Sequence, residues 1–432
     1  MDKHQKILKS LTAFMLALML GLTSVTYISE PAYAAASTTT GTATATSSTP
    51  AYPSAKRVTI AKYDLTFASK VRTDRTLGSA SLPRHLLASG ARNSVKLTWT
   101  PAKDLSSIDG YVIARKDASG SRWRQIAKVS ASAKSYKDTT ATVKNRLYSY
   151  TVVAYKKTGS VWTVTRPLIW AGAVSSNSSK QNVKAFSFVN PARISTVKIG
   201  VKKKLALSFS YKDPVSKTIR WTSSNKAIAK VNSKGEVTGV SRGTVTLSGR
   251  THTGNIIQTK VKVIKPGTAQ AIVDVMASWI NFSEVNRKHE GIIDIYNSVK
   301  PWPRGYKVKY SDEWCATCVS AAAIMSGTSK YTNRECGVPQ FITYFKSLGR
   351  WEEDGSVRPK PGYLIIYGWS IGDNVTVFGN DWSASHIGVV ESVKGNQITV
   401  IEGNMGAGTV GRRTIKQGWR FIRGYCRPNY KK

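Results

Sequence analysis

The chain has 432 residues, of which 41% are hydrophobic and 20% charged, so it is long enough for roughly two to four domains and too apolar for a disordered chain. Its formal net charge of +40 is concentrated before residue 270: residues 270–432 hold 21 Lys/Arg and 14 Asp/Glu, which leaves 43 and 10 for residues 1–269. We expect so basic a region to bind a polyanion, but no motif for base recognition stands out, which argues against specific nucleic-acid binding.

The N-terminus is predicted to be a secretory signal peptide over residues 1–34. Three lysines precede the apolar run LTAFMLALMLGL, and Ala-Tyr-Ala at residues 32–34 supplies an A-x-A cleavage site. The run is shorter than the roughly 20 residues that a membrane anchor needs. Residues 35–55 are rich in Ser, Thr and Pro and predict a flexible linker. We therefore expect a secreted protein, extracellular or associated with the cell wall, without a membrane anchor.

Residues 80–178 predict a β-sandwich. The runs SVKLTW, GYVIARK, SYTVVAY and SVWTVT alternate apolar and polar side chains and are separated by turn residues. The order of Trp99, Tyr111 and Tyr148 along these runs resembles a fibronectin type III module, with Tyr148 at the place of its tyrosine corner. We expect these aromatic side chains to fill a core rather than to bind a ligand.

Residues 188–266 predict a second β-sandwich. The run STVKIGVKKKLALSFS is followed by Trp221, the turn SSN, and the glycine-valine spacings Gly235-x-Val237 and Gly243-x-Val245. This pattern resembles a bacterial Ig-like domain of group 2, a common spacer in surface proteins. We expect the two basic sandwiches to hold the protein on anionic cell-wall polymers.

Residues 270–432 predict a third domain that contains helices. Lys265-Pro266-Gly267 ends the strand pattern, and the following stretch AIVDVMASWI places apolar residues at helical spacing. All four cysteines lie in this domain, at positions 315, 318, 336 and 426. The third domain is therefore where we expect the chemistry.

Cys315, in the stretch DEWCATCVSAAAI, is the candidate nucleophile. Ser311 and Asp312 are candidate N-caps for a helix of small and apolar residues. Cys315 would then lie in the first turn, where unpaired backbone N–H groups and the helix dipole favour the thiolate. Cys318 falls one turn later and is interpreted as a small buried side chain.

His386 is the candidate base, because a thiolate nucleophile for acyl transfer is usually paired with a histidine. It begins the stretch HIGVVESVKGNQITVIEGNM, which predicts two strands around a loop at Lys394-Gly395-Asn396. In this register His386 lies opposite Asn404, and Glu402 is a diagonal neighbour on the same face. We expect Glu402 and Asn404 to orient His386 through its second ring nitrogen.

These motifs carry a family resemblance. WCATCVS resembles the nucleophile box W-C-A-x-F-V-S of CHAP-type peptidoglycan amidohydrolases, relatives of the NlpC-type papain-like hydrolases, and SHIGVVESVKGNQITVIEGN resembles their His strand and Glu/Asn strand. The resemblance spans about residues 270–430 and implies an α+β papain-like CHAP domain there. Together with the two predicted sandwiches, the expected fold is two all-β Ig-like sandwiches followed by an α+β papain-like CHAP domain. It implies Cys315 as nucleophile, His386 as general base and then acid, Glu402 as orienting carboxylate and Asn404 as further polar support.

Three residues depart from the family pattern. Cys318 stands where an aromatic residue is usual, Ser385 where an acidic residue often precedes the histidine, and Tyr363 where Pro-Gly is usually followed by Asp. None of them removes a catalytic group. The resemblance thus implies a secreted cell-wall hydrolase that cuts an amide bond of peptidoglycan without a metal or organic cofactor. The sequence leaves open whether it is an N-acetylmuramoyl-L-alanine amidase or an endopeptidase.

The four cysteines are also compatible with other kinds of chemistry. A thiol-disulfide oxidoreductase using Cys315 and Cys318 would need a hydrophobic strand before C-x-x-C, whereas GYKVKYSDE is short and polar. A four-cysteine zinc site would need a second close pair, but Cys336 and Cys426 are 90 residues apart. Those two cysteines are candidates for a disulfide, with Cys318 as an alternative partner. A non-catalytic wall-binding surface protein is the second functional hypothesis.

Overall fold

A computed structural model describes part of the chain: residues 63–64, 70–71, 77–117, 123–165, 170–175, 178–179, 181–183, 186–211, 214–369 and 384–432. The predicted signal peptide and linker lie outside these residues. Within the described ranges, no helix is both long and apolar enough to cross a membrane.

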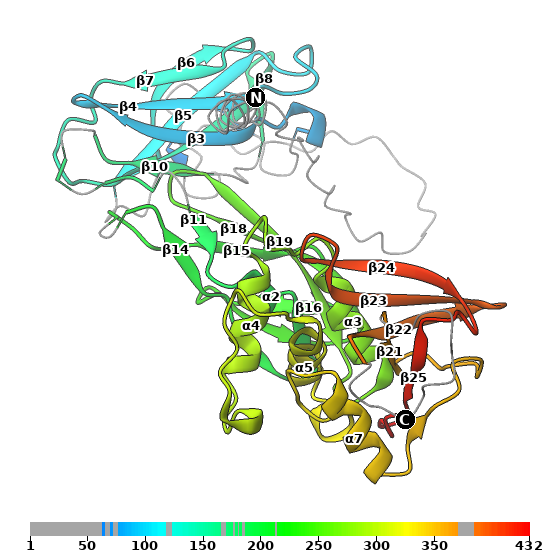
Figure 1. Ribbon diagram of the computed structural model, residues 1–432. Helices are drawn as coiled ribbons and strands as arrows, with labels where there is room; N and C mark the ends of the chain where they lie inside the picture. Colours follow the sequence, from blue (N-terminus) through cyan, green and yellow to red (C-terminus); the bar gives the residue numbers. More distant parts are fainter. Residues whose placement is uncertain are drawn as a thin grey trace, which may run out of the picture. The chain divides into compact units, whose positions relative to one another are not determined.

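The first sandwich consists of two facing sheets (Figure 1). The larger sheet has the order β1-β6-β5-β8-β9-β2, with β10 paired to β8, and the smaller has the order β3-β4-β7. Trp99 and Tyr111 pack edge to face in the core between the sheets, with ring centroids 5.8 Å apart. The strands are β1 (Tyr63–Asp64), β2 (Lys70–Val71), β3 (Arg84–Ala91), β4 (Ser94–Thr100), β5 (Gly110–Asp117), β6 (Trp123–Ser130), β7 (Ser135–Asp138), β8 (Tyr148–Thr158), β9 (Val161–Val164) and β10 (Ala171–Ala173).

The corner between β7 and β8 is held by Tyr150 rather than by the predicted Tyr148. The Tyr150 hydroxyl donates to Asp138 Oδ2 over 2.8 Å, and the Arg115 guanidinium binds the same oxygen at 2.8 Å. The ring of Tyr148 lies under Arg115 instead, with the guanidinium carbon 5.0 Å from the ring centroid. The two tyrosines are two residues apart and therefore share one face of the strand, so alternation alone did not distinguish them.

The second sandwich has a four-stranded sheet, β12-β19-β18-β15, a three-stranded sheet, β13-β17-β16, and the pair β11-β14. Gly235 has φ +73°, and a Cβ there would lie 2.8 Å from Trp221 Nε1, which explains the glycine of the sequence pattern. The elements are β11 (Phe186–Phe188), α2 (Pro191–Ile194), β12 (Thr196–Lys198), β13 (Lys202–Lys204), β14 (Leu207–Phe209), β15 (Arg220–Ser223), β16 (Ala229–Val231), β17 (Glu236–Gly239), β18 (Gly243–Arg250) and β19 (Ile256–Ile264).

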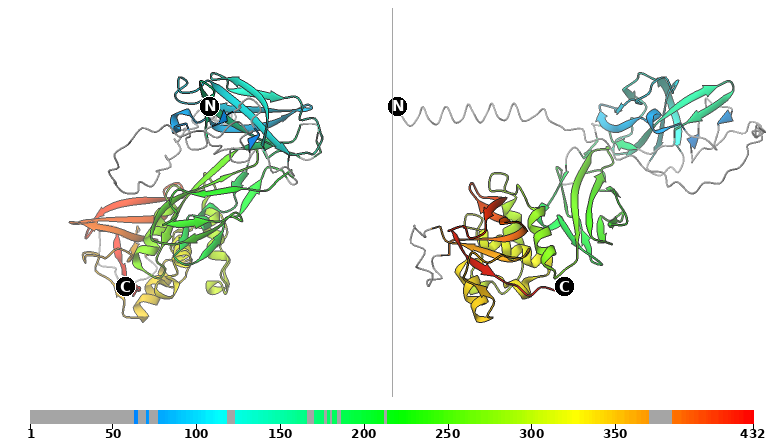
Figure 2. Two further views of the ribbon diagram at one scale, coloured as in Figure 1. Left: turned by 180° about the vertical axis from the view of Figure 1, so that it is seen from behind. Right: turned by 90° about the vertical axis from the view of Figure 1, so that its right-hand side faces the viewer.

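The C-terminal domain is an antiparallel sheet with helices against one face (Figures 1 and 2). The sheet order is β20-β25-β21-β22-β23-β24. Its helix-facing side chains join the main core, and its other face carries a smaller cluster around Tyr367 and Tyr425. The helices are α3 (Ala269–Ser278), α4 (His289–Asn297), α5 (Cys315–Ser326), α6 (Ser329–Thr332) and α7 (Pro339–Ser347); the strands are β20 (Trp351–Glu352), β21 (Leu364–Tyr367), β22 (His386–Lys394), β23 (Gln397–Met405), β24 (Thr409–Lys416) and β25 (Ile422–Cys426).

Helix α5 is the central helix of this domain. Eleven of its residues are buried, and it packs against α3, α4, β22 and β23. Its sequence CATCVSAAAIMS consists of small and apolar residues on every side, the pattern of a helix surrounded by protein. Gly327 ends the helix in the left-handed conformation at φ 72°.

Candidate functional site

Cys315 is the first residue of α5, as the sequence predicted, but the cap differs. Trp314 occupies the N-cap position and makes no side-chain cap hydrogen bond. Asp312, a predicted cap, instead accepts hydrogen bonds at Oδ2 from the Lys309 N–H and the Tyr306 hydroxyl, each over 2.7 Å. The N-terminus of α5 therefore has no side-chain acceptor from its N-cap and is open to a negatively charged group.

The structure brings Cys315, His386 and Glu402 together. His386 begins β22, next to the start of α5, and its Nε2 lies 3.1 Å from Glu402 Oε2. Cys315 and His386 are each 7% exposed, and Glu402 is fully buried. Because Nε2 is held by Glu402, Nδ1 is the ring nitrogen left to interact with Cys315.

The strand register explains how these side chains meet. Gly388 pairs with Glu402 and Val389 with Ile401, which is the predicted register at the end of the hairpin that carries the site. Near the turn the register shifts by one, because Lys394 pairs with Gln397 around a two-residue loop. A bulge at Glu391 restores the predicted pairing, so the predicted register is wrong near the turn but correct beside Glu402.

Glu402 also binds two residues that the sequence analysis missed. Tyr367 donates its hydroxyl proton to Oε1 over 2.9 Å, and Arg413 Nε lies 2.9 Å from Oε1 and 3.1 Å from Oε2. Tyr367 pairs directly with His386 in the sheet, and Arg413 pairs with Val400, two residues before Glu402 on the same face of β23. The sequence feature that could have pointed to Arg413 is the Arg-Arg pair of VGRRTI, which lies on a strand next to the strand that carries Glu402.

For both His386 and Glu402, burial shifts the pKa in one direction and the neighbouring groups shift it in the other. Burial lowers the pKa of His386, but its hydrogen bonds and charge interactions with Cys315 and Glu402 outweigh this and raise the pKa to about 9. Burial raises the pKa of Glu402, but His386 and Arg413 outweigh it and hold the pKa below its usual range. At neutral pH the pair is therefore an imidazolium and a carboxylate.

Asn404 lies on the same strand as Glu402 but contacts a different residue from the expected one. Its side-chain amide donates to the Glu313 carboxylate, and its backbone is in the left-handed region at φ 59°. The expected support of His386 by Asn404 is thus replaced by a contact with the residue two positions before Cys315. Asn404 consequently links β23 to the segment that precedes α5.

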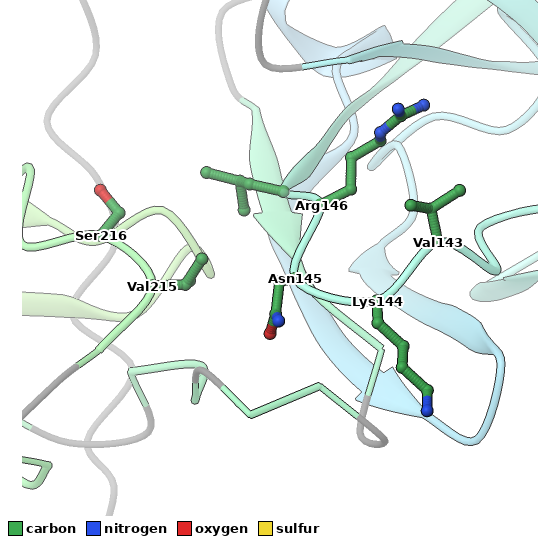
Figure 3. A pocket seen from close by; sticks show the side chains of 7 residues that line it. Val143, Lys144, Asn145, Arg146, Val215 and Ser216 are labelled. Carbon is green, nitrogen blue, oxygen red and sulfur yellow. The ribbon is translucent and has the colours of Figure 1, made fainter.

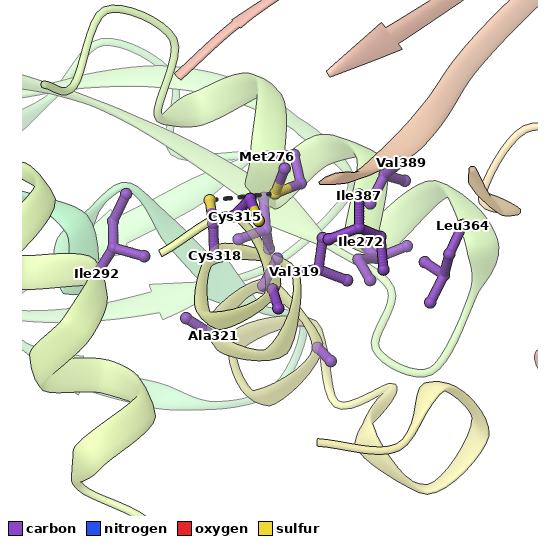
Figure 4. Close-up of a cluster of buried hydrophobic side chains, with 14 of the residues drawn as sticks. Ile272, Met276, Ile292, Cys315, Cys318, Val319, Ala321, Leu364, Ile387 and Val389 are labelled. Atoms are coloured by element: carbon purple, nitrogen blue, oxygen red, sulfur yellow. Dashed lines mark hydrogen bonds between the residues drawn. The ribbon is translucent and has the colours of Figure 1, made fainter. Parts of the chain in front are cut away.

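Cys318 is fully buried and packs against a sulfur atom (Figure 4). Its Sγ lies 3.8 Å from Met276 Sδ, and burial raises the pKa of its thiol far above the usual value, with the neighbouring Cys315 adding to the rise. A thiol held protonated in this way is a poor redox partner. All four cysteines are free thiols, so the proposed Cys336–Cys426 disulfide is absent among them.

A cluster of aromatic side chains flanks His386 on the β21 side. Tyr367 and Trp369 stack with ring centroids 4.9 Å apart at an interplanar angle of 12°, and Trp369 lies 5.9 Å from the His386 ring. Trp419 and Phe421 contact Trp369 at 5.9 and 5.8 Å. We call Tyr367, Trp369, Trp419 and Phe421 the aromatic shelf.

Two of the pockets in the described part of the chain lie away from this shelf. The first is lined by residues 143–147 of the first sandwich with Val215 and Ser216, and it holds no candidate nucleophile (Figure 3). The second, which we call the Glu313 pocket, lies beside the start of α5. It is lined by Arg304, Tyr306, Val308, Asp312, Glu313, Cys336 and Gly337. Within the described ranges, no group of three or more His, Cys, Asp and Glu side chains is arranged to hold a metal ion.

Comparison with protein families assigns two parts of the chain. The CHAP domain model matches residues 305–404, and the bacterial Ig-like domain (group 2) model matches residues 182–264. The chain thus contains an Ig-like β-sandwich region followed by a CHAP domain of mixed α/β structure. A CHAP domain implies a peptidoglycan hydrolase, and a bacterial Ig-like domain suggests a surface or binding module.

Individual proteins match over part of this chain only. An alpha-L-arabinofuranosidase of Bifidobacterium longum subsp. longum is 37% identical over 67 residues, which is 16% of this chain and only 6% of that protein. The central fibronectin-III array of RIM-binding protein is 12% identical, covering 44% of this chain and 72% of that chain with a TM-score of 0.21. The intimin-Tir90 complex is 21% identical, covering 20% of this chain and 56% of that chain with a TM-score of 0.15.

Proposed function

We propose that this chain is a secreted cell-wall hydrolase that cuts an amide bond of peptidoglycan, with Cys315 as nucleophile and His386 as general acid and base. The observation that carries the proposal is the alignment of three groups in the CHAP domain. A thiol at an uncapped helix N-terminus helps to raise the pKa of a histidine, and a buried carboxylate holds a ring nitrogen of that histidine. This is the arrangement that nucleophilic acyl transfer requires.

The proposed mechanism begins from an ion pair. Because the pKa of His386 is raised to about 9, the ring is protonated at neutral pH, and the proposed nucleophile is a Cys315 thiolate paired with this imidazolium. The thiolate attacks the amide carbonyl carbon, and backbone N–H groups at the start of α5 stabilise the oxyanion. The C–N bond then breaks, and His386 gives its proton to the leaving amine.

The second half of the reaction releases the acyl group. His386, now neutral, takes a proton from water as the water attacks the thioester carbonyl. The C–S bond breaks, the product leaves as a carboxylic acid, and the imidazolium–thiolate pair is restored. Glu402 keeps the ring oriented through both steps, and Asn404 holds Glu313 beside the nucleophile.

The sandwiches are proposed to attach the enzyme to anionic wall polymers. In the second sandwich, Lys202 and Lys230 both pair with Thr238, one on each side, and therefore project from the same face of the three-stranded sheet. Both lysines are exposed, as is Lys204 two residues further along β13. This face offers closely spaced cations to a polyanion.

The proposal is tested by comparing the wild-type chain with Cys315→Ala and Cys318→Ala on isolated peptidoglycan, with mass spectrometry of the soluble products. We expect release by the wild type and by Cys318→Ala but not by Cys315→Ala. Equal release by Cys315→Ala would contradict the nucleophile. Sedimentation of every protein with walls without release of product would favour the non-catalytic wall-binding alternative.

The proposed mechanism needs no metal ion, which gives an independent prediction. Adding a chelator such as EDTA should leave the rate of release unchanged, whereas alkylation of the enzyme with iodoacetamide should abolish it. A large loss of activity with chelator, restored by a divalent metal, would contradict this mechanism.

A further inference from the structure

Apart from Tyr367, which donates a hydrogen bond to Glu402, the aromatic shelf is not used by the proposed mechanism, although it lies against the catalytic histidine. Trp369 is 39% exposed, and it is at the same time in ring contact with Tyr367, His386, Trp419 and Phe421. A tryptophan that is fixed by its neighbours and still open to solvent forms a preorganised apolar surface, because binding to it orders few side chains. Its contact with His386 makes this surface continuous with the site of reaction.

The sheet topology places the shelf and the Glu313 pocket on opposite sides of His386. The shelf comes from the end of β21 and the segment before β25, and both of these strands precede β22 in the sheet order. Asn404, which binds Glu313, comes from β23 on the other side of β22. A substrate whose scissile bond lies over Cys315 therefore extends along the shelf in one direction and towards the Glu313 pocket in the other.

The two flanks differ in chemistry. The exposed ring of the shelf is that of Trp369, beside which the Arg413 guanidinium carbon lies 5.3 Å from the ring centroid. An exposed indole packs well against the broad C–H faces of pyranose sugars. The Glu313 pocket presents the Asp312 and Glu313 carboxylates and the Arg304 guanidinium, which suit ammonium and carboxylate groups. Of the two parts of peptidoglycan, the glycan carries the sugar rings, and the short stem peptide carries the charged groups and small side chains.

We propose that the aromatic shelf binds the sugar next to the scissile bond and that the stem peptide extends into the Glu313 pocket. This inference rests on the proposed function and selects among its possible bonds. The carbonyl attacked by Cys315 is then the lactyl carbonyl of the sugar, which is transferred to Sγ as a thioester. The amino group of the first alanine leaves with the proton of His386, and water returns the lactyl group as a carboxylate.

The shelf is tested by steady-state kinetics of the full chain on peptidoglycan fragments that carry both sugar and stem peptide. Trp369→Ala should raise KM by roughly tenfold, the scale of a lost aromatic contact, with a smaller change in kcat. Trp369→Phe should recover most of the loss, because a flat ring is retained, and Trp369→Leu should not. The matched control is Tyr310→Ala, which removes a similarly exposed aromatic side chain, 46% exposed, outside the shelf.

A second measurement asks for the bond directly. Products should carry a new alanine N-terminus and a free lactyl carboxylate, and a stem peptide without sugar should not be cleaved. N-Acetylglucosamine oligomers should quench the tryptophan fluorescence of Cys315→Ala and lose this effect in Cys315→Ala/Trp369→Ala.

The outcomes separate the two proposals. Cleavage that depends on Cys315 but falls within the stem peptide, or a KM that is unchanged by Trp369→Ala, would overturn the inference and leave the proposed function standing. Absence of any cleavage that depends on Cys315 would overturn both.

Discussion

Glu402 is the residue on which the electrostatics of the site depend. It is fully buried, and its carboxylate receives hydrogen bonds from His386, Tyr367 and Arg413. A buried carboxylate is tolerated when charged partners surround it, and breaking one such partnership leaves an uncompensated charge. With Cys315 as a thiolate, the site holds two negative groups, Cys315 and Glu402, and two positive groups, His386 and Arg413.

Arg413 is therefore expected to act as a positioning residue through Glu402. Arg413→Ala should lower kcat/KM by roughly 10- to 100-fold, the scale expected when a catalytic group loses its orientation. Because Arg413 helps to hold the pKa of Glu402 low, its removal should move the acid limb of the pH–activity profile to higher pH. Steady-state rates across the acid range would measure both effects.

The conservative variant supplies the control for this prediction. Arg413→Lys keeps the positive charge and loses the two-oxygen geometry, so it should keep the acid limb near its wild-type position while recovering only part of the rate. An acid limb that does not move in Arg413→Ala would show that Arg413 has a structural role alone.

The raised pKa of His386 predicts the alkaline limb of activity. The folded-state value is about 9 and the ordinary value is 6.5, so the protonated ring stabilises the fold fully below pH 6.5, and this contribution is lost as pH rises through 9. The imidazolium that protonates the leaving amine is lost over the same range. The pH dependence of kcat/KM should therefore fall with a midpoint near 9, and a fall centred near 6.5 would contradict the ion pair.

The sequence predicted best those single positions whose chemical role only a few residue types can fill. Few residues serve as nucleophile and base, and the alternation of the two strands placed His386 and Glu402 on one face before any contact was known. Arg413 and Tyr367 were missed because an arginine on an outer strand and a tyrosine at a strand end have many structural uses. Their contacts with Glu402 depend on the order of strands in the sheet, which short-range patterns do not specify.

At the scale of elements, the helix and the hairpin were predicted in type but not in their ends. Helix α5 begins at Cys315 without the expected cap, because Asp312 binds the Lys309 N–H and the Tyr306 hydroxyl outside the helix. The hairpin turns in two residues and not three, and a bulge absorbs the difference. Caps and turns are decided by single hydrogen bonds, whereas the type of an element is decided by the pattern of many residues.

The packing of α5 against β23 gives a prediction for Gly403. A Cβ at this position would lie 2.5 Å from Cys318 Cβ, 2.7 Å from Cys318 Sγ and 3.0 Å from Trp314. Gly403→Ala should therefore push β23 from the helix, cost about 1–3 kcal/mol of stability and move Glu402 relative to His386. Calorimetry should show a lower melting temperature for the C-terminal domain together with a loss of activity.

Gly411→Ala is the matched control in the neighbouring strand. A Cβ there meets only the flexible end of Met405, at 3.1 Å from Sδ and 3.8 Å from Cε, which can move aside. We expect its stability to change little. Equal destabilisation by both substitutions would show that the close approach of Gly403 to Cys318 is not the cause.

At the scale of the whole molecule, charge and chemistry are separated along the sequence. Residues 1–269 carry 43 of the 64 basic residues and 10 of the 24 acidic ones, and the candidate catalytic groups lie beyond residue 314. An excess of positive charge strengthens association with a polyanion at low salt without taking part in bond cleavage. Binding to walls and turnover of small substrates should therefore respond differently to the same charge change.

Reversing the charges of Lys202 and Lys230 tests whether wall binding and catalysis are separate. The double variant Lys202→Glu/Lys230→Glu changes the charge of one face of the second sandwich by four, and it should weaken sedimentation with isolated walls, most clearly at low ionic strength. Its rate on soluble peptidoglycan fragments should equal that of the wild type, because both lysines lie in the second sandwich and not in the CHAP domain.

The control for this prediction changes a lysine elsewhere. Lys394→Glu reverses an exposed charge at the tip of the β22–β23 hairpin and should leave wall binding nearly unchanged. Removal of teichoic polymers from the walls should reduce binding of the wild type to the level of the double variant. If the double variant bound as well as the wild type at low salt, wall attachment would have to be assigned to another surface, since these lysines form the cationic face on which the proposed contact depends.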